Sequence, residues 1–217
     1  MVSLVIDGSN NNLSICCIKE DKILSKSSIK CYRNLSEIIL KEVDNCLDNA
    51  SIKKNDITEI IVTGGPGSYT ALRVVLSIAK TLSYVLKIPI KTISSLRLFS
   101  ANCDKNVLTV PLFDGRRGNV YSAIYLGDEE ILKEGYYAFK EVIDYINKEN
   151  KAVNFVTNSD NFEYNDVEVD YKVFIKDIDA ADYLFVKNFS EEVDSFTAVP
   201  NYLRLTEAER NLINDKN

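Results

Sequence analysis

The chain has 217 residues, of which 46% are hydrophobic and 27% charged, a composition typical of a globular protein with one large domain or two compact lobes. It contains no histidine, which excludes the commonest general base, the commonest metal ligand and every Ser-His or Cys-His nucleophile. The formal net charge of −6 argues against a protein that holds nucleic acid by itself, because neutralising phosphates requires clustered Lys and Arg.

The first half of the chain predicts an antiparallel meander followed by alternating helices and strands. Three strands are expected over residues 2–6, 13–19 and 22–29, because short apolar runs are separated there by polar turns. Apolar residues at helical spacing then indicate a helix over 36–48. The elements that follow are a strand over 59–63, a helix over 70–86, a strand over 89–93 and a short helix over 96–102.

The second half begins in the same way, with Asp114-Gly115 after its first strand where the first half has Asp7-Gly8. Its expected elements are strands 107–113, 119–126 and 131–137, helix 140–148, strands 154–157 and 171–175, and helix 180–188. This duplicated order is typical of the actin-like (ASKHA), ribonuclease-H-like α/β fold, in which mixed sheets are flanked by helices. We expect an N-terminal lobe of residues 1–103 and a smaller, degenerate lobe of residues 104–217.

The cysteines and the length of the apolar runs indicate in which cellular compartment the protein is found. The five cysteines include no Cys-x-x-Cys pair and lie in apolar surroundings, so we expect reduced core residues and no metal site. No apolar run in the sequence approaches the length that crosses a bilayer. The sequence therefore predicts a cytoplasmic protein without membrane contact.

The most informative segment is Gly64-Gly65-Pro66-Gly67-Ser68, which links a short strand to a long helix. Closely spaced glycines indicate backbone angles or close approaches that a side chain would forbid. One interpretation is anion binding at the helix N-terminus, and the other is a tight connection in which Ser68 caps the helix. The lack of a Lys in the loop favours the tight connection, because a Walker loop needs that Lys.

Two aspartates end the first strands of the two halves. In actin-like ATPases a carboxylate at the position of Asp7 lies beside metal-bound phosphates, and Asp114 would supply a second carboxylate; the alternative is two ordinary Asp-Gly turns. The residues of a candidate nucleotide or anion site are Asp7, Gly8, Ser9, Gly67, Ser68 and Asp114. An actin-like ATPase or kinase that uses Asp7 and Asp114 is thus one hypothesis of function, although no adenosine site is recognisable.

The long helix over 70–86 has two apolar rows. A second row of Val74, Ile78 and Val85 accompanies the main one, which indicates either docking to another chain or burial beneath the helix over 36–48.

Ser68 could also be considered as a nucleophile. This interpretation is disfavoured because the sequence offers no histidine and no nearby lysine as a base to activate it.

A basic pair, Arg116-Arg117, forms a hairpin tip on an acidic chain. It could contact RNA or an acidic partner, and the alternative is a solvated turn.

Three motifs carry a resemblance to a known family. They are Ile-Val-Thr-Gly-Gly-Pro-Gly-Ser-Tyr-Thr-Ala-Leu-Arg (61–73), Phe-Asp-Gly-Arg-Arg-Gly-Asn-Val-Tyr (113–121) and Pro-Asn-Tyr-Leu-Arg (200–204). In order and over nearly the whole chain, the sequence resembles the TsaB (YeaZ) family, a subunit of the bacterial machinery for tRNA threonylcarbamoyladenosine (t6A).

The resemblance implies a non-catalytic scaffold without catalytic residues of its own. It would pair with the catalytic paralogue TsaD, which transfers threonylcarbamoyl to adenosine 37 of tRNAs reading ANN codons, and with the ATPase TsaE. ATP, Mg and a metal would belong to these partner subunits, tRNA would be met only through the complex, and the isolated chain would form a homodimer. The resemblance places the subunit interface on the first-lobe helices, at Leu35, Ile38, Ile39, Val43, Arg73, Val74, Ile78 and Val85.

The sequence departs from the family pattern at three positions. Gly8 stands where Thr is common, Leu35 where a His often occurs, and Ala71 where Gly is frequent. The missing His removes a remnant of the metal motif of the catalytic paralogue and favours the interpretation without catalysis. A peptidase, the third hypothesis, would require a metal site or an activated nucleophile, which a chain without histidine does not readily provide.

Overall fold

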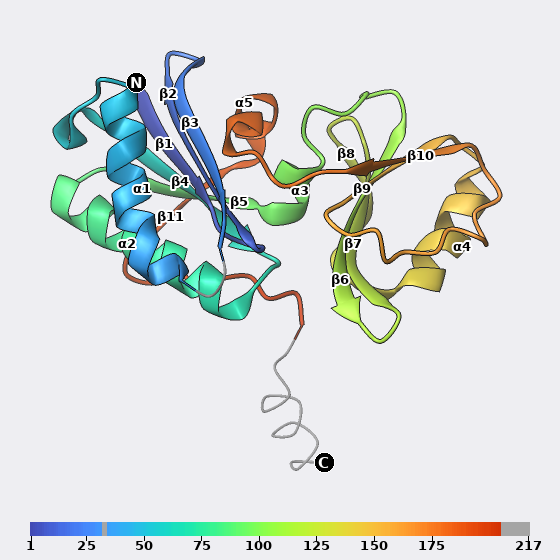
Figure 1. Ribbon diagram of the computed structural model, residues 1–217. Coiled ribbons are helices and arrows are strands. Elements are labelled where there is room, and N and C mark those ends of the chain that lie inside the picture. Colours follow the sequence, from blue (N-terminus) through green and yellow to red (C-terminus); the bar gives the residue numbers. More distant parts are fainter. Residues whose placement is uncertain (32–33, 205–217) are drawn as a thin grey trace, which may run out of the picture.

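The computed structural model describes residues 1–31 and 34–204, which form two mixed sheets with helices on their faces (Figure 1). The first sheet has six strands. In spatial order they are β11 (Glu191–Val193), β5 (Ile90–Ser94), β4 (Glu59–Gly65), β1 (Val2–Asp7), β2 (Asn12–Lys19) and β3 (Lys22–Lys30). β1 to β3 form the predicted antiparallel meander, and β4 and β5 extend the sheet in parallel from β1.

The second sheet repeats the arrangement of the first. Its strands in spatial order are β10 (Tyr171–Ile175), β9 (Val153–Thr157), β6 (Leu108–Arg116), β7 (Asn119–Leu126) and β8 (Glu129–Ala138). As in the first sheet, an antiparallel meander (β6 to β8) is extended by two parallel strands, β9 and β10. The duplication predicted from the repeated order of elements is therefore present.

The two copies differ in their helices. α1 (Leu35–Asn49) and α4 (Phe139–Glu149) occupy equivalent places after the two meanders. Between β4 and β5 the chain forms the long helix α2 (Tyr69–Leu86), whereas residues 158–170, between β9 and β10, contain neither helix nor strand. The second copy is degenerate at the point where its sequence becomes polar and acidic.

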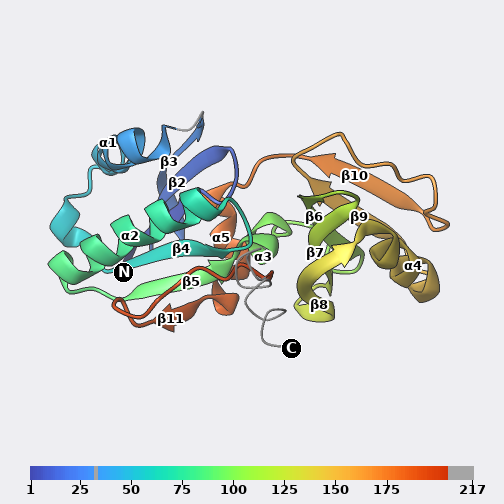
Figure 2. The same ribbon diagram turned by 90° about the horizontal axis from the view of Figure 1, so that it is seen from below.

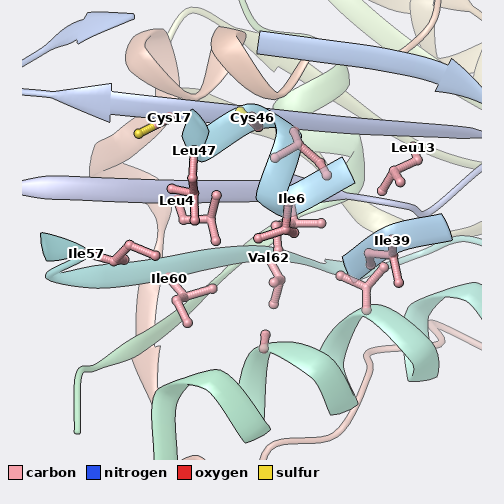
Figure 3. Close-up of a cluster of buried hydrophobic side chains, with 14 of the residues drawn as sticks. Leu4, Ile6, Leu13, Cys17, Ile39, Cys46, Leu47, Ile57, Ile60 and Val62 are labelled. Carbon is pink, nitrogen blue, oxygen red and sulfur yellow. The ribbon is translucent and has the colours of Figure 1, made fainter. Parts of the chain in front are cut away.

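α1 and α2 cover one face of the first sheet (Figures 1 and 2). Apolar side chains of three strands meet those of α1 in a cluster of buried residues, shown in Figure 3. They include Leu4, Ile6, Leu13, Cys17, Ile60 and Val62 from the sheet and Ile39, Cys46 and Leu47 from α1. Each fully buried Leu or Ile contributes about 1.5–3 kcal/mol to folding, so this cluster fixes both helices on the sheet.

Short helical segments cover the other face of the first sheet and join the two lobes. They are α3 (Ser95–Phe99), η2 (Ala180–Asp182), α5 (Tyr183–Val186) and η3 (Lys187–Phe189). The core beneath them also contains Phe113 and Val156 of the second sheet, and the rings of Phe99 and Phe113 lie 5.0 Å apart. The lobes therefore share a hydrophobic core.

A buried arginine adds to this junction. The Arg97 guanidinium lies 3.6 Å from the ring centre of Tyr125 and 4.2 Å from that of Phe189, and it donates a hydrogen bond to the carbonyl of Gly127. Arg97 thus links β7 and the loop after it to the C-terminal segment.

The predicted division into residues 1–103 and 104–217 does not describe the C-terminal segment correctly. The C-terminal segment, described from Ile178 to Arg204, returns to the first lobe, where β11 pairs antiparallel with β5 and the amide of Ala180 donates to Ser14 Oγ. β11 was not predicted from the sequence, because its three residues are too few to show an alternating pattern. The helix expected over 180–188 consists of η2, α5 and η3, and the helix expected over 96–102 ends at Phe99.

α2 also differs from the expectation that no segment could cross a bilayer. Its 18 residues have a mean hydropathy of 1.2, so by length and composition alone it meets the minimum for a membrane span. In the fold, however, α2 packs on β4 and β5, and its Leu72, Val75 and Ala79 are buried. This packing accounts for the apolar residues on the inner face of α2.

The glycine loop generates a prediction about stability. Gly65 has a φ of 120°, and a Cβ at this position would collide with the carbonyl of Asn201. Gly65→Ala should therefore lower the free energy of unfolding by about 1–3 kcal/mol, as measured by urea denaturation. The neighbouring Gly64→Ala is the control, because its Cβ would make only ordinary contacts, the nearest with Thr92 at 3.4 Å. Equal stability of the two variants would contradict this account of the loop.

Candidate functional site

A cavity of about 810 Å³ opens where loops of the two lobes meet. The first lobe contributes residues 9–11 after β1 and residues 67–70 at the start of α2, and the second lobe contributes the hairpin between β6 and β7. Residues 158–159, Tyr121 and Arg204 complete the walls. Within the part of the chain that the structure describes, Ser9 Oγ and Asn10 Nδ2 are buried without a hydrogen-bond partner.

Four of the predicted nucleotide or anion residues line this cavity: Ser9, Gly67, Ser68 and Asp114. Gly8 is buried instead, and a Cβ there would collide with Val75, so the Gly at this position allows the β1 loop to pack against α2. Asp7 does not line the cavity either. The structure thus brings together only part of the predicted site.

Asp7 is fully buried at the end of β1. Its Oδ1 accepts hydrogen bonds from Thr63 Oγ1 at 2.7 Å and from the amide of Ser9 at 3.1 Å, while Oδ2 has no partner among the described residues. Burial raises the pKa of this carboxyl above its ordinary value, against the opposing effect of the hydrogen bonds. Asp7 therefore ties β1 to β4 and lies outside the lining of the cavity.

The glycine loop is a tight connection, as its composition favours. The amide of Ser68 donates to the carbonyl of Ser9 at 2.6 Å, and a Cβ on Gly67 would collide with that carbonyl. Ser68 Oγ accepts from the amide of Ala71, which makes Ser68 the predicted cap of α2. The Ser68 amide is consequently not available to an anion, and anion binding by the remaining residues stays a prediction.

Asp114 orders the hairpin between β6 and β7. Its Oδ1 accepts from the amide of Arg116 at 2.7 Å, and Arg116 and Arg117 both have positive φ, as tight hairpin turns require. Asp114 is exposed and lines the cavity, whereas Asp7 is buried beneath the first lobe's loop. The two aspartates expected to act across a cleft therefore do not share one.

The C-terminal segment forms contacts that the sequence did not reveal. The amide of Asn201 donates to the carbonyl of Gly64 at 2.7 Å, and the rings of Tyr202 and Tyr69 stack at 4.8 Å. Arg73 Nε donates to the Tyr202 hydroxyl at 2.8 Å, with its guanidinium 4.2 Å from the ring centre of Tyr69. Arg73, predicted at the subunit interface, is thus engaged within the chain. Its partner is 129 residues away, beyond the reach of pattern analysis.

The interface predicted on α1 requires a correction. Leu35, Ile39 and Val43 are buried in the first core, with exposed fractions of 9%, 0% and 3%, because α1 turns its apolar face to the sheet. These side chains cannot contact a partner in this fold. Ile38 is half-buried against the same core.

The second row of α2 remains accessible in part. Val74 and Ile78 are half-buried, and Val85 is 66% exposed. α1 lies along one side of α2 and the C-terminal segment along the other, where Lys80 donates to the carbonyls of Phe196 and Ala198 (Figure 2). An interface at Val74, Ile78 and Val85 stays a prediction.

The buried carboxyl generates a prediction about pH. Because the pKa of Asp7 is raised in the folded state, the folded chain binds a proton that the unfolded chain has released above its pKa of 3.8. The free energy of unfolding should therefore fall as pH rises through the raised pKa. Asp7→Asn keeps the Oδ1 acceptor but replaces the carboxyl group that titrates. The free energy of unfolding of this variant, relative to that of the unaltered chain, should therefore increase with pH, as measured by urea denaturation.

Asp194→Asn is the matched control for this measurement. Hydrogen bonds from the amides of Thr197 and Phe196 lower the pKa of Asp194. Its contribution to stability is present above the unfolded pKa and is lost as pH falls, so the relative stability of this variant should decrease with pH. The account of Asp7 is wrong if the stability difference of Asp7→Asn does not change with pH.

Comparison with known proteins identifies the family. A family model described as TsaD: tRNA N6-adenosine threonylcarbamoyltransferase matches residues 25–211. The chain is 30% identical to the tRNA threonylcarbamoyladenosine biosynthesis protein TsaB of Bacillus subtilis over 221 residues, which cover 96% of each protein. A shorter match to TsaB of Escherichia coli, 28% identical over 135 residues, covers 61% of this chain and 58% of that protein.

Solved structures have the same fold. YeaZ from Pseudomonas aeruginosa superimposes with a TM-score of 0.74 at 20% identity, over 93% of this chain and 99% of that one. A protein described as similar to peptidase YeaZ, also from Pseudomonas aeruginosa, gives a TM-score of 0.78 at 20% identity, over 94% and 99%. The predicted actin-like fold is confirmed. The chain has the duplicated sheets and the glycine loop, and it matches TsaB over 96% of its length. It therefore belongs to the TsaB (YeaZ) family.

Proposed function

We propose that this chain is a non-catalytic subunit for the biosynthesis of t6A in cytoplasmic tRNA, and that it activates a TsaD-type threonylcarbamoyltransferase by binding it. The relatives named TsaB support the pathway. The observation that carries the proposed role is the apolar row of Val74, Ile78 and Val85 on α2, which extends from the core of the first lobe to the surface.

This row lies in a place suited to docking. The C-terminal segment covers the opposite side of α2, where Tyr84 meets Phe196 with ring centres 5.8 Å apart, so the chain itself does not cover Val85. A specific interface buries on the order of 800 Å² per partner, so we expect the interface to include the exposed side of α1 as well as this row. A second copy of the chain would use the same surface in the absence of the partner.

The alternative function as an ATPase or kinase receives less support from the geometry. Metal-bound phosphates need a carboxylate with free oxygens facing the ligand, and Asp7 is buried with its pKa raised by burial. The residues present therefore do not fit a magnesium nucleotide held by Asp7 and Asp114. ATP, Mg and the metal are proposed to belong to the TsaE-type and TsaD-type partners.

The docking surface generates a prediction about association. Val85→Glu would bury an unpaired charge in an apolar interface, so it should weaken binding to the TsaD-type partner at least tenfold, as measured by isothermal calorimetry. The isolated variant should stay folded because Val85 is 66% exposed.

Phe185→Glu is the control for this variant. Phe185 is 56% exposed on α5, which covers the other face of the first sheet. This variant should bind the partner as tightly as the unaltered chain. Equal binding by Val85→Glu and the unaltered chain would rule out the proposed surface.

Reconstitution tests the function itself. TsaD-type and TsaE-type proteins of the same source, tRNA, ATP and a threonylcarbamoyl donor should form t6A only when this chain is added, as measured by nucleoside mass spectrometry. The chain alone should form none. Full activity of the other components without this chain would refute the proposed role.

A further inference from the structure

Most arginines of the described residues lie around the interlobe cavity. The described residues include five arginines: Arg73, Arg97, Arg116, Arg117 and Arg204. Arg116 and Arg204 line the interlobe cavity, Arg117 lies next to Arg116 at the hairpin tip, and Arg73 lies over Tyr69, another wall of the cavity. Only Arg97 is buried elsewhere. In a chain with 32 acidic and 26 basic residues, four arginines thus lie around one opening.

The charges of these four arginines are not neutralised by carboxylates in the described part of the chain. All seven ion pairs found there use lysine. Arg73 and Arg204 contact tyrosines instead: Arg204 Nη1 donates to the Tyr136 hydroxyl at 2.9 Å, with the guanidinium 4.4 Å from the ring centre. A guanidinium held in this way keeps its charge and further donors for an anion.

Aromatic rings alternate with these arginines. Tyr69 and Tyr202 stack at 4.8 Å, and Tyr69 is 46% exposed at the edge of the cavity. We call the set of Arg73, Arg116, Arg117, Arg204, Tyr69 and Tyr202 the Arg–Tyr rim. Arginines that contact phosphates, combined with exposed rings on which bases stack, are the means by which proteins bind unpaired nucleotides.

The hairpin tip presents its guanidinium groups without using them for folding. Asp114 Oδ1 binds the amide of Arg116, and the Tyr136 hydroxyl donates to the carbonyl of Gly115 at 3.0 Å. Both contacts involve the backbone of the tip, so the side chains of Arg116 and Arg117 are exposed and not required for the turn. They can therefore be replaced without loss of the fold.

We propose that the Arg–Tyr rim binds the tRNA substrate of the assembled complex, with its arginines on phosphates and an unpaired base on Tyr69. This inference rests on the proposed function, because the acidic chain as a whole repels RNA and needs a partner to hold the rest of the tRNA. RNA is favoured over an acidic protein because the rim offers a partly exposed aromatic residue, Tyr69, as well as positive charge.

The test is binding of unmodified tRNA to the complex reconstituted with the TsaD-type and TsaE-type subunits, measured by fluorescence anisotropy at several salt concentrations. Arg116→Ala/Arg117→Ala should weaken binding about tenfold at low salt and reduce the slope of log K against log salt by about 2. Lys54→Ala/Lys148→Ala removes the same charge away from the rim and should leave the slope near that of the unaltered complex. Tyr69→Leu should weaken binding, and Tyr69→Phe should restore it, because only the ring is required.

Light scattering on the same samples separates this inference from the proposed function. If the unaltered chain does not assemble with its partners, the proposed function fails. If the complex assembles and the arginine variants bind tRNA with unchanged affinity and salt slope, the assignment of the rim to RNA is wrong. Loss of assembly in the arginine variants with unchanged tRNA binding would also overturn it, because the rim would then bind a protein.

Discussion

The return of the C-terminal segment to the first lobe is the constraint on which the rest of the structure depends. β11 adds to the edge of the first sheet, and Asn201 then binds the carbonyl of Gly64 in the glycine loop. The positive φ of Gly65 leaves room for this approach. The segment covers one side of α2, and Arg204 reaches Tyr136 of the second lobe. The C-terminal segment thereby determines which side of α2 stays exposed, and it places Arg204 at the cavity.

The actin-like fold is retained in this chain, but Asp7, the aspartate at the end of its first strand, is buried. A cavity still opens between the lobes, but the loop after β1 packs against α2 through Gly8, and Asp7 joins two strands. Because burial disfavours the charged form, this carboxyl is suited to holding β1 and β4 together and unsuited to holding a metal.

The sequence predicted the fold well because its elements are local. The meanders, α1, α2 and the repeated Asp-Gly turns follow from patterns a few residues long, and each is present at nearly the predicted bounds. The assignments that failed depended on distant contacts. The burial of Leu35, Ile39 and Val43 depends on which face of α1 meets the sheet, and a family resemblance does not specify that face. β11 and the stack of Tyr69, Arg73 and Tyr202 join residues far apart in the sequence, so no periodicity could reveal them.

The central claim is that the outer row of α2 is the docking surface for a catalytic partner. Hydrogen–deuterium exchange of this chain, alone and mixed with the TsaD-type subunit, tests it most directly. The account predicts that the partner slows exchange in peptides covering α1 and residues 74–85 of α2, with little change in the second sheet. Protection confined to the second sheet, or none under conditions in which the complex forms, would contradict it.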